Sequence, residues 1–232
     1  MESRKQFIMN TEQVLERMAK ACQRCGRSAQ EVSLMAVTKT HPLEATHWAL
    51  EAGLKHLGEN RVQELARKHP QVDDPSACWE LIGPVQSNKA RLAVEHADRI
   101  QTLDRLKLVN AFERHCADLG KARLRVLLQV NVGEDPAKHG CEVAEAASLV
   151  EAIQQTQHLE LEGLMTIGEL TEEEARIRCT FSRLRELRDR LSAGSGLALP
   201  VLSMGMTGDL EWAIEEGSTL IRVGTALFGA RE

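Results

Sequence analysis

The sequence predicts an α/β protein, a single (β/α)8 TIM-type barrel that carries one additional N-terminal helix. From Ser33 onward, short β-branched or aliphatic runs alternate with longer stretches of helical periodicity, a pattern typical of βα units and a parallel sheet. Eight such alternations can be counted, and this number suits a closed barrel better than an open sheet. The length of 232 residues is also ordinary for one barrel domain.

The N-terminal element is predicted to be an amphipathic helix over about residues 10–25. Asn10 is a possible N-cap, and Gly26 is expected to end the helix. The segment of about residues 1–27 should pack on the barrel, so that residues 1–232 form a single domain.

The barrel elements follow in chain order. Strands are expected at the short β-branched or aliphatic runs, and helices where apolar residues recur every three to four positions. The predicted strands are Ser33–Thr38, His56–Glu59, Trp79–Ile82, Arg99–Thr102, Arg125–Asn131, Leu161–Ile167, Pro200–Met204 and Thr219–Val223. The predicted helices are Glu44–Ala52, Arg61–Lys68, Ser87–His96, Arg105–Leu119, Val143–Gln155, Glu172–Leu191 and Leu210–Glu216.

The composition argues against several classes of function. A hydrophobic fraction of 43% with 27% charged residues is ordinary for a globular protein, and no apolar run is long enough to cross a bilayer. The first residues lack the apolar stretch of a signal peptide, so a cytoplasmic location is expected. Nucleic-acid binding is not expected, because the net charge is -5, Lys and Arg are scattered, and Tyr is absent.

The six cysteines do not indicate a disulfide framework or a metal site. Cys22 and Cys25 form a CxxC pair, but they continue the apolar stripe of the N-terminal helix at helical spacing. A zinc site would need two further ligands at close spacing, and the sequence has no second CxxC and no HxxxH. The pair is therefore predicted to be core packing, and no metal is assigned.

Residues at the ends of the predicted strands are the candidates for chemistry, because the loops that follow parallel barrel strands converge on one mouth. Lys39 comes directly after the first strand. Partial desolvation there favours the neutral amine, which can condense with an aldehyde to form an imine. The alternative is that Lys39 starts a loop and reaches water, which is the commoner fate of a lysine in isolation.

Two segments have the composition of a phosphate site. Residues 203–208 lead from the seventh strand into a helix and contain Ser203 and Gly205, while Arg222 ends the eighth strand and is followed by Gly224 and Thr225. Backbone N–H groups at such turns form an anion nest. Phosphate sites after strands seven and eight recur in barrels of this kind. Each glycine taken alone is equally consistent with turn chemistry.

Six sequence blocks in one order resemble the pyridoxal phosphate homeostasis protein family, which is related to the barrel domain of alanine racemase. The resemblance runs from about residue 10 to the C-terminus. The blocks are Ala36-Val37-Thr38-Lys39, His56 through Glu64, Ile82-Gly83-Pro84 with Gln86-Ser87-Asn88-Lys89, Gly163 through Gly168, Leu202 through Met206, and Gly217-Ser218-Thr219 through Thr225 with Phe228-Gly229-Ala230-Arg231.

The resemblance implies a fold-type III barrel that holds pyridoxal 5′-phosphate (PLP) as an imine on Lys39. It further implies that the phosphate is held by Ser203, Gly224 and Thr225 with the Gly205 turn, that Arg222 faces the pyridine nitrogen, and that Asn60 lies beside the ring. One departure is Glu80, where the family commonly has His after the Trp. An ionised carboxylate cannot donate a hydrogen bond, so this departure puts any role of that His in doubt.

Three functions are compatible with these residues. The first is a binding protein that carries, buffers or delivers PLP to PLP-dependent apoenzymes, with no catalytic residue assigned. The second is a PLP-dependent amino-acid racemase, and the third is a cofactor-free aldolase that uses Lys39 directly on a sugar phosphate. The sequence leaves open whether the chain is a monomer or a weak dimer and which proteins receive the cofactor.

The first function is favoured because racemisation needs an acid or base on each face of the substrate carbon. In the related racemase the second such group is a Tyr from an additional domain. This sequence contains no Tyr, and it stops just past the eighth predicted strand, so no such domain is expected. His41 and His139 are possible substitutes, but both are predicted in loops. An always-protonated Arg222 at the ring nitrogen would also weaken the ring as an electron sink.

Overall fold

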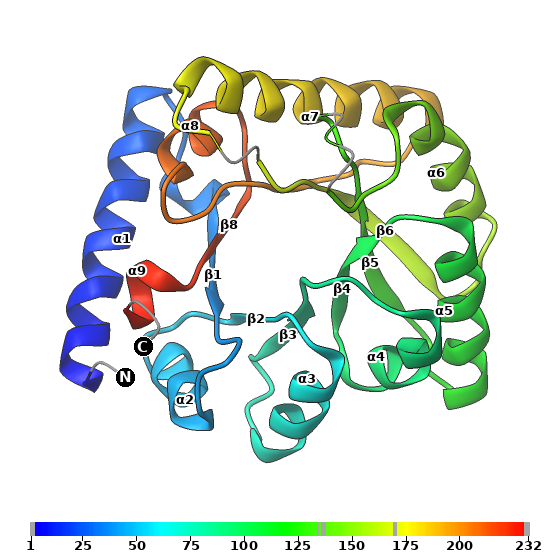
Figure 1. Ribbon diagram of the computed structural model, residues 1–232, viewed down its shortest axis with the longest axis horizontal. Coiled ribbons are helices and arrows are strands. Elements are labelled where there is room, and N and C mark those ends of the chain that lie inside the picture. Colours follow the sequence, from blue (N-terminus) through cyan, green and yellow to red (C-terminus); the bar gives the residue numbers. More distant parts are fainter. Residues whose placement is uncertain (1–2, 134, 136–137, 169–170, 230–232) are drawn as a thin grey trace.

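Eight parallel strands close into one barrel in the computed structural model, which describes residues 3–133, 135, 138–168 and 171–229 (Figure 1). Each strand pairs with its neighbours in chain order, and β1 pairs with β8 to close the ring. The strands are β1 Ser33–Val37, β2 His56–Glu59, β3 Cys78–Leu81, β4 Arg99–Leu103, β5 Leu124–Gln129, β6 Leu159–Met165, β7 Val201–Ser203 and β8 Leu220–Val223. The predicted eight-stranded barrel is confirmed.

Helices alternate with the strands and surround the barrel (Figure 1). The α-helices are α1 Arg4–Arg24, α2 Leu43–Glu51, α3 Val62–Lys68, α4 Ala90–His96, α5 Leu106–Leu119, α6 Ala146–Gln154, α7 Glu174–Ser195, α8 Leu210–Glu215 and α9 Thr225–Phe228. Short 3-10 helices occupy Ala29–Glu31, His69–Gln71, Ser87–Lys89 and Val143–Glu145. Ala230 and Arg231, which belong to the last sequence block, lie outside the described residues.

Helix α1 begins six residues earlier than predicted, since it starts at Arg4 rather than at about residue 10. Its N-cap is Ser3, whose side chain accepts a hydrogen bond from the Gln6 N–H. Asn10 lies inside the helix, where its Nδ2 donates to the Leu227 carbonyl at 3.1 Å. The long-range partner of Asn10 explains the error, because a short polar side chain that indicated a cap is used for a tertiary contact.

Two other boundaries differ from the prediction for local reasons. Helix α7 continues to Ser195 instead of ending at Leu191, and Gly196 ends it in a left-handed conformation with φ 74°. Strand β6 begins at Leu159, two residues earlier than predicted, because it pairs with the start of β5 at Leu124.

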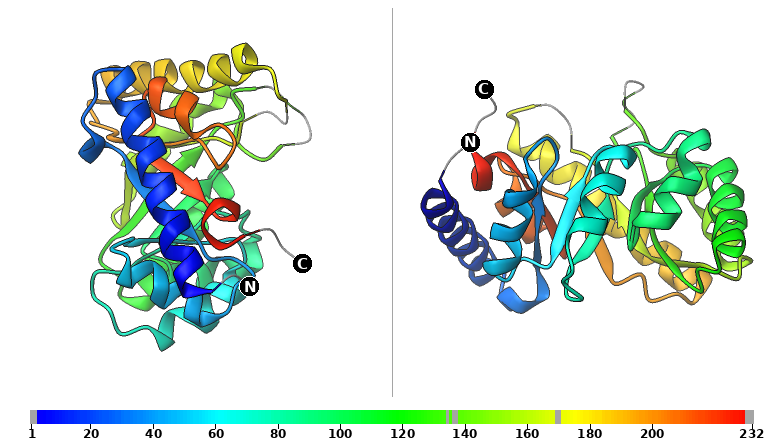
Figure 2. Two further views of the ribbon diagram at one scale, coloured as in Figure 1. Left: turned by 90° about the vertical axis from the view of Figure 1, so that its left-hand side faces the viewer. Right: turned by 90° about the horizontal axis from the view of Figure 1, so that it is seen from below.

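Helix α1 supplies the cover that the eighth βα unit lacks. Within the described residues, strand β8 is followed by the four-residue helix α9, and α1 packs against α8 and α9 beside it (Figure 2). Phe7 of α1 stacks on Phe228 of α9 with ring centroids 5.1 Å apart and meets Trp48 of α2 at 6.2 Å. The helix that precedes the barrel in sequence therefore completes its outer ring in space.

The cysteine pair of α1 is part of this packing. Cys22 is buried, and the thiol of Cys25 donates to the carbonyls of Ala21 and Cys22 within the helix. All six cysteines are free thiols. The prediction of a packing role for the CxxC pair is confirmed. No helix in the described part of the chain is long and apolar enough to cross a membrane.

The interior of the barrel is divided between apolar and polar side chains. Met35, Val37, Ile82 and Leu220 form a small apolar cluster separate from the larger core between the sheet and its helices. Buried polar side chains lie on strands β3, β4, β7 and β8, namely Glu80, Arg99, Gln101, Ser203 and Arg222. The mouth of the barrel is built above these two groups.

Candidate functional site

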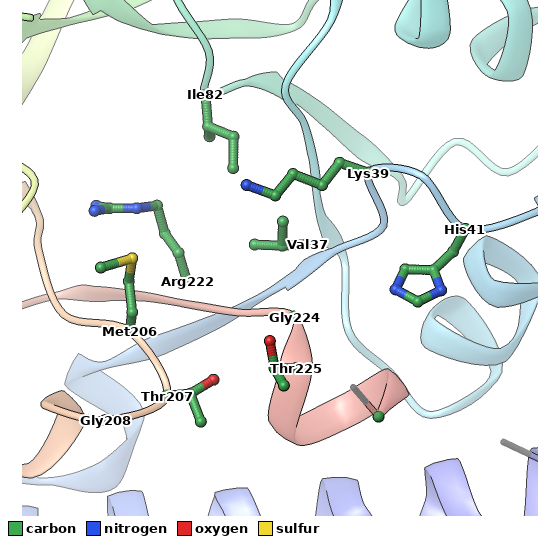
Figure 3. Close-up of a pocket in the computed structure, with 11 residues that line it drawn as sticks. Val37, Lys39, His41, Ile82, Met206, Thr207, Gly208, Arg222, Gly224 and Thr225 are labelled. Atoms are coloured by element: carbon green, nitrogen blue, oxygen red, sulfur yellow. The ribbon is translucent and has the colours of Figure 1, made fainter. Parts of the chain in front are cut away.

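A small pocket opens where strands β1 and β8 end (Figure 3). Its volume is 240 Å³, slightly below the roughly 300–1,000 Å³ of most ligand pockets. It is lined by Val37, Lys39, His41, Ile82, Met206, Thr207, Gly208, Arg222, Gly224, Thr225 and Gly229. A pocket of this size suits a one-ring ligand rather than a dinucleotide.

Lys39 reaches into this pocket from the end of β1. Its amine end points toward the space between Ile82 and Arg222, while His41 lies on the far side of the lysine backbone (Figure 3). The aromatic ring of His41 packs on Phe228 with centroids 4.8 Å apart. The sequence-based placement of an amine at the barrel mouth therefore agrees with the geometry.

The backbone on both sides of Lys39 is held by three charged residues of β2 and α3, which we call the Lys39 clamp: Glu59, Glu64 and Lys68. The Thr38 hydroxyl donates to Glu59 at 2.7 Å, and the Lys68 ammonium donates to the Thr38 carbonyl at 2.8 Å. After Lys39, the N–H of Thr40 donates to Glu64 at 2.7 Å.

Thr40 has a φ of 65°, an unfavourable value for a β-branched residue. The clamp thus fixes a strained turn directly after Lys39.

The Lys39 clamp places two carboxyl groups, Glu59 and Glu64, around one buried ammonium, Lys68. Lys68 is 1% exposed and lies 2.8 Å from both Glu59 and Glu64. The second carboxylate oxygen of Glu59 has no hydrogen-bond partner among the described residues. Burial raises the pKa of Glu59, and the attraction of Lys68 offsets only part of that effect. The amine is therefore positioned by a costly and uneven arrangement of charges.

The wall opposite Lys39 has the features of an anion site. Thr207 and Thr225 bring hydroxyl groups to this wall, and Gly208 and Gly224 also line it (Figure 3). A Cβ on Gly224 would lie 3.3 Å from the Val37 carbonyl, so glycine allows β8 to approach β1 closely there. The N–H groups of the first turn of a helix have no acceptor within that helix, and α9 starts at Thr225.

Arg222 forms the floor between these two walls. Its guanidinium is buried, donating to the Ser203 hydroxyl at 2.7 Å and to the Thr166 carbonyl at 2.9 Å. Burial lowers the pKa of Arg222 to about 10, although the charges of Asp209 and Glu80 act in the opposite direction. No carboxylate contacts Arg222 directly within the described residues, so its charge is available to a ligand.

The structure brings some of the predicted site residues together and separates others. Lys39, Arg222, Gly224 and Thr225 line the pocket. Ser203 and Gly205 are buried and do not line it, and Asn60 lines a neighbouring pocket instead.

Ser203 and Gly205 have structural partners where they lie. The Ser203 hydroxyl donates to Gln101 at 2.7 Å and accepts from Arg222. Gly205, with φ 96°, sits where a Cβ would come within 2.5 Å of Ala213 Cβ. Its turn lets the chain carry the next residues to the pocket.

Sequence reasoning did not single out Thr207, Met206 and Gly208, the residues of the Gly205 turn that reach the pocket. It also missed the apolar walls Val37 and Ile82. One signal could have indicated Thr207: it is a hydroxyl residue shortly before a helix, in a segment predicted to hold a phosphate. Val37 and Ile82 are ordinary strand residues in sequence, and only barrel closure places them beside Lys39.

Two other hollows lie elsewhere on the barrel. The neighbouring pocket of 480 Å³ is lined by Asn60 with Arg61, Lys89, Arg105 and His139, among others. A larger hollow of 670 Å³ lies at the opposite end of the barrel, beside the start of β6 and β7, the face that usually serves stability.

His56, Cys78 and Glu80 have the spacing of a metal site. However, Arg99 already occupies both oxygens of the Glu80 carboxylate at 2.7 Å. The Arg99 guanidinium therefore takes the place that a metal ion would occupy beside Glu80.

The closed parallel barrel with a strand-end amine at its mouth defines the class of protein. The family model described as "Alanine racemase, N-terminal domain" matches residues 10–232. Alanine racemase from Corynebacterium glutamicum shares the fold with a TM-score of 0.75 at 18% identity, over 98% of this chain and 62% of that chain.

Curated relatives narrow this class. The pyridoxal phosphate homeostasis protein of Pseudomonas aeruginosa is 44% identical over 96% of this chain and 95% of its own length, and that of Escherichia coli is 38% identical over 96% of both. PipY of Synechococcus elongatus, solved with PLP bound, has a TM-score of 0.82 at 38% identity, covering 93% of this chain and 100% of that one. The chain belongs to the pyridoxal phosphate homeostasis protein family.

Proposed function

We propose that this chain binds PLP covalently through Lys39 and holds it for release, as a protein of intracellular PLP homeostasis. The observation that carries the proposal is the small pocket in which the Lys39 amine, the buried Arg222 guanidinium and two threonine hydroxyls face one space. The names of the curated relatives and the PLP-bound PipY support the same ligand.

The residues present fit PLP part by part. When bound, PLP supplies an aldehyde that condenses with an amine and a dianionic phosphate on the other side of a polar ring. Lys39 would take the aldehyde. Thr207, Gly224 and Thr225 would hold the phosphate, and Arg222 would face the ring nitrogen between them.

Ser203 and Gly205, which were predicted to bind the phosphate, would act indirectly. Ser203 would support the site through its hydrogen bond to Arg222, and Gly205 would act by shaping the turn that presents Thr207. Asn60 lies beside Gly83, whose added Cβ would come within 3.0 Å of the Asn60 backbone. A contact of the Asn60 side chain with the ring stays a prediction.

The residues at the pocket favour holding the cofactor over catalysing with it. Lys39, His41 and Arg222 are the ionisable side chains that line it in the described part of the chain. The His41 ring packs on Phe228, and Arg222 would disfavour protonation of the ring nitrogen. His41 nevertheless lines the pocket, and this favours amino-acid racemisation as the second candidate function. We further infer a cytoplasmic location, transfer of PLP to apoenzymes, and a monomer or weak dimer.

Absorbance and peptide mapping test the proposal. The purified protein should show a visible absorption band that borohydride abolishes, with the added mass of reduced PLP on the peptide that contains Lys39. Lys39→Ala should lose this label. It should unfold within about 1 kcal/mol of the parent, because a half-buried lysine at a strand end contributes little packing. Lys89→Ala, at the neighbouring pocket, is the matched control and should keep the label.

A protein that stays colourless with excess PLP, or one labelled equally after Lys39→Ala, would overturn the proposal. Racemase activity is tested separately by incubating the loaded protein with L-amino acids and separating the products on a chiral column. D-amino acid formed at a rate that falls with His41→Ala would favour the second candidate. Its absence supports the carrier function.

A further inference from the structure

A line of buried side chains connects the pocket to the interior of the barrel. Arg222 donates to the Ser203 hydroxyl at 2.7 Å, Ser203 donates to Gln101 Oε1 at 2.7 Å, and Gln101 Nε2 donates to Glu80 Oε2 at 2.6 Å. Ser203, Gln101 and Glu80 are each 0% exposed. We call these three residues the Arg222 relay.

Every hydrogen bond of the relay points from Arg222 toward Glu80, because a guanidinium can only donate and an ionised carboxylate can only accept. An ionised carboxylate can only accept, so the nitrogen side of the Gln101 amide must face Glu80. The amide oxygen is then left to accept from Ser203, and the Ser203 lone pairs are left to accept from Arg222. A histidine at position 80 could present a donor and would not fix the orientation of the Gln101 amide.

Glu80 is kept ionised by its own partners. Arg99 contacts both of its oxygens at 2.7 Å, and His56 Nδ1 lies 2.5 Å from Oε1. Burial alone would raise the pKa of Glu80, but the hydrogen bond from His56 and the charge of Arg99 outweigh it and hold the pKa at about 2. The acceptor end of the relay is therefore fixed at any physiological pH.

We propose that Glu80 is a positioning residue for the bound cofactor: through Gln101 and Ser203 it sets the orientation of the Arg222 guanidinium that faces the ring. The inference rests on the proposed function, because the readout is PLP itself. A purely structural role for Glu80 would need only its contacts with Arg99 and His56. The relay adds a second role: Glu80 also affects the orientation of Arg222 in the pocket, through residues on β4 and β7.

Gln101→Met is the decisive variant, because it cuts the relay and leaves the Glu80–Arg99 pair intact. It keeps the side-chain length but removes both hydrogen bonds of the amide. Glu80→Gln cuts the relay at its end. Glu162→Gln is the matched control: it removes the other carboxylate from Arg99, bound at 2.9 Å, but lies off the path to Arg222.

We expect Gln101→Met to shift the visible absorption maximum of bound PLP and to weaken PLP binding about three- to tenfold, the loss typical of one or two hydrogen bonds. Glu80→Gln should shift the maximum in the same direction, and adding it to Gln101→Met should change the spectrum no further, since the path is already cut. Glu162→Gln should leave the maximum and the affinity unchanged, whatever it does to the melting temperature.

Two outcomes would overturn the inference. One is a Gln101→Met protein with the parent spectrum and affinity. The other is an equal spectral shift in Glu162→Gln, which would indicate general loosening of the barrel. If Glu80→Gln does not fold, Gln101→Met with its control still decides the matter. A parent protein without a PLP band would reject the proposed function itself, so the two failures are distinguishable.

Discussion

The Lys39 side of the mouth and the Arg222 side are supported by buried polar networks of different design. The Lys39 clamp uses ionised groups on β2 and α3 and acts on backbone atoms, the carbonyl of Thr38 and the N–H of Thr40. The Arg222 relay uses a hydroxyl and an amide inside the barrel and acts on a side chain. One network therefore fixes where the chain runs, and the other fixes where one charged group points.

The difference follows from what each residue is proposed to do. A lysine that forms and breaks a covalent bond must move its side chain, and the clamp acts on the residues before and after it, Thr38 and Thr40. An arginine that must stay charged while buried needs fixed acceptors, because a buried cation without them is costly. The clamp leaves an oxygen of Glu59 without a partner among the described residues, whereas each relay atom named above has one. The clamp is consequently the less stable of the two arrangements.

The largest effect should come from removing the cation of the clamp. Lys68→Met would leave Glu59 and Glu64 with unbalanced charge, and breaking a buried pair typically costs about 3–5 kcal/mol. For a chain of this length that loss corresponds to a fall in melting temperature of roughly 10 °C. Differential scanning calorimetry measures it. PLP affinity should fall as well, since the Thr38 carbonyl loses its donor and Glu64, which accepts from the Thr40 N–H, loses its counter-ion.

Lys121→Met is the control for this prediction. Lys121 is half-buried, and its ammonium donates to the carbonyls of Val94 and Ala97, with no carboxylate in contact among the described residues. It should cost less stability and leave PLP binding unchanged. Adding Glu59→Gln to Lys68→Met should recover part of the lost stability. A Lys68→Met protein that melts at the parent temperature would show that the clamp contributes nothing.

The two networks also differ in how far the sequence could predict them. Lys39, Arg222, Gly224 and Thr225 were predictable, because they stand at strand ends and match a family pattern. Gln101 and Lys68 look like an ordinary strand residue and the last residue of a surface helix. Their roles depend on barrel closure, which brings β4 beside β7 and β8 across the interior and turns Lys68 inward under Thr38. Side-chain partners of this kind have no local signal, whereas alternation of strands and helices does.

Lowering the pH should change the stability contributions of the two networks in opposite directions. His56 and Arg99 hold the folded-state pKa of Glu80 at about 2, below its ordinary value of 4.5. The stabilisation from Glu80 is therefore present above pH 4.5 and is lost as pH falls toward 2. The folded-state pKa of Glu59 is raised, so its ionisation costs stability at neutral pH, and this cost is relieved as pH falls through that pKa.

Urea unfolding between pH 7 and pH 3 measures both effects. The stability advantage of the parent over Glu80→Gln should shrink as pH falls below 4.5. The difference between the parent and Glu59→Gln should instead move in favour of the parent as pH falls. Parallel pH profiles for the two variants would mean that the carboxylates are not held in opposite ways.

The smallest effect should come from the anion side of the pocket, where no single group dominates. Thr225→Val removes one hydroxyl while leaving the backbone N–H groups of the turn, so PLP binding should weaken only about fivefold, the equivalent of roughly 1 kcal/mol for one hydrogen bond. Pyridoxal, which lacks the phosphate, should bind parent and variant equally. Titrating parent and variant with PLP and with pyridoxal measures the four affinities. Thr207→Val should give the same result as Thr225→Val if both hydroxyls bind the phosphate. A variant that loses affinity for pyridoxal as well would place Thr225 at the ring, and the phosphate would then have to lie on another wall of the pocket.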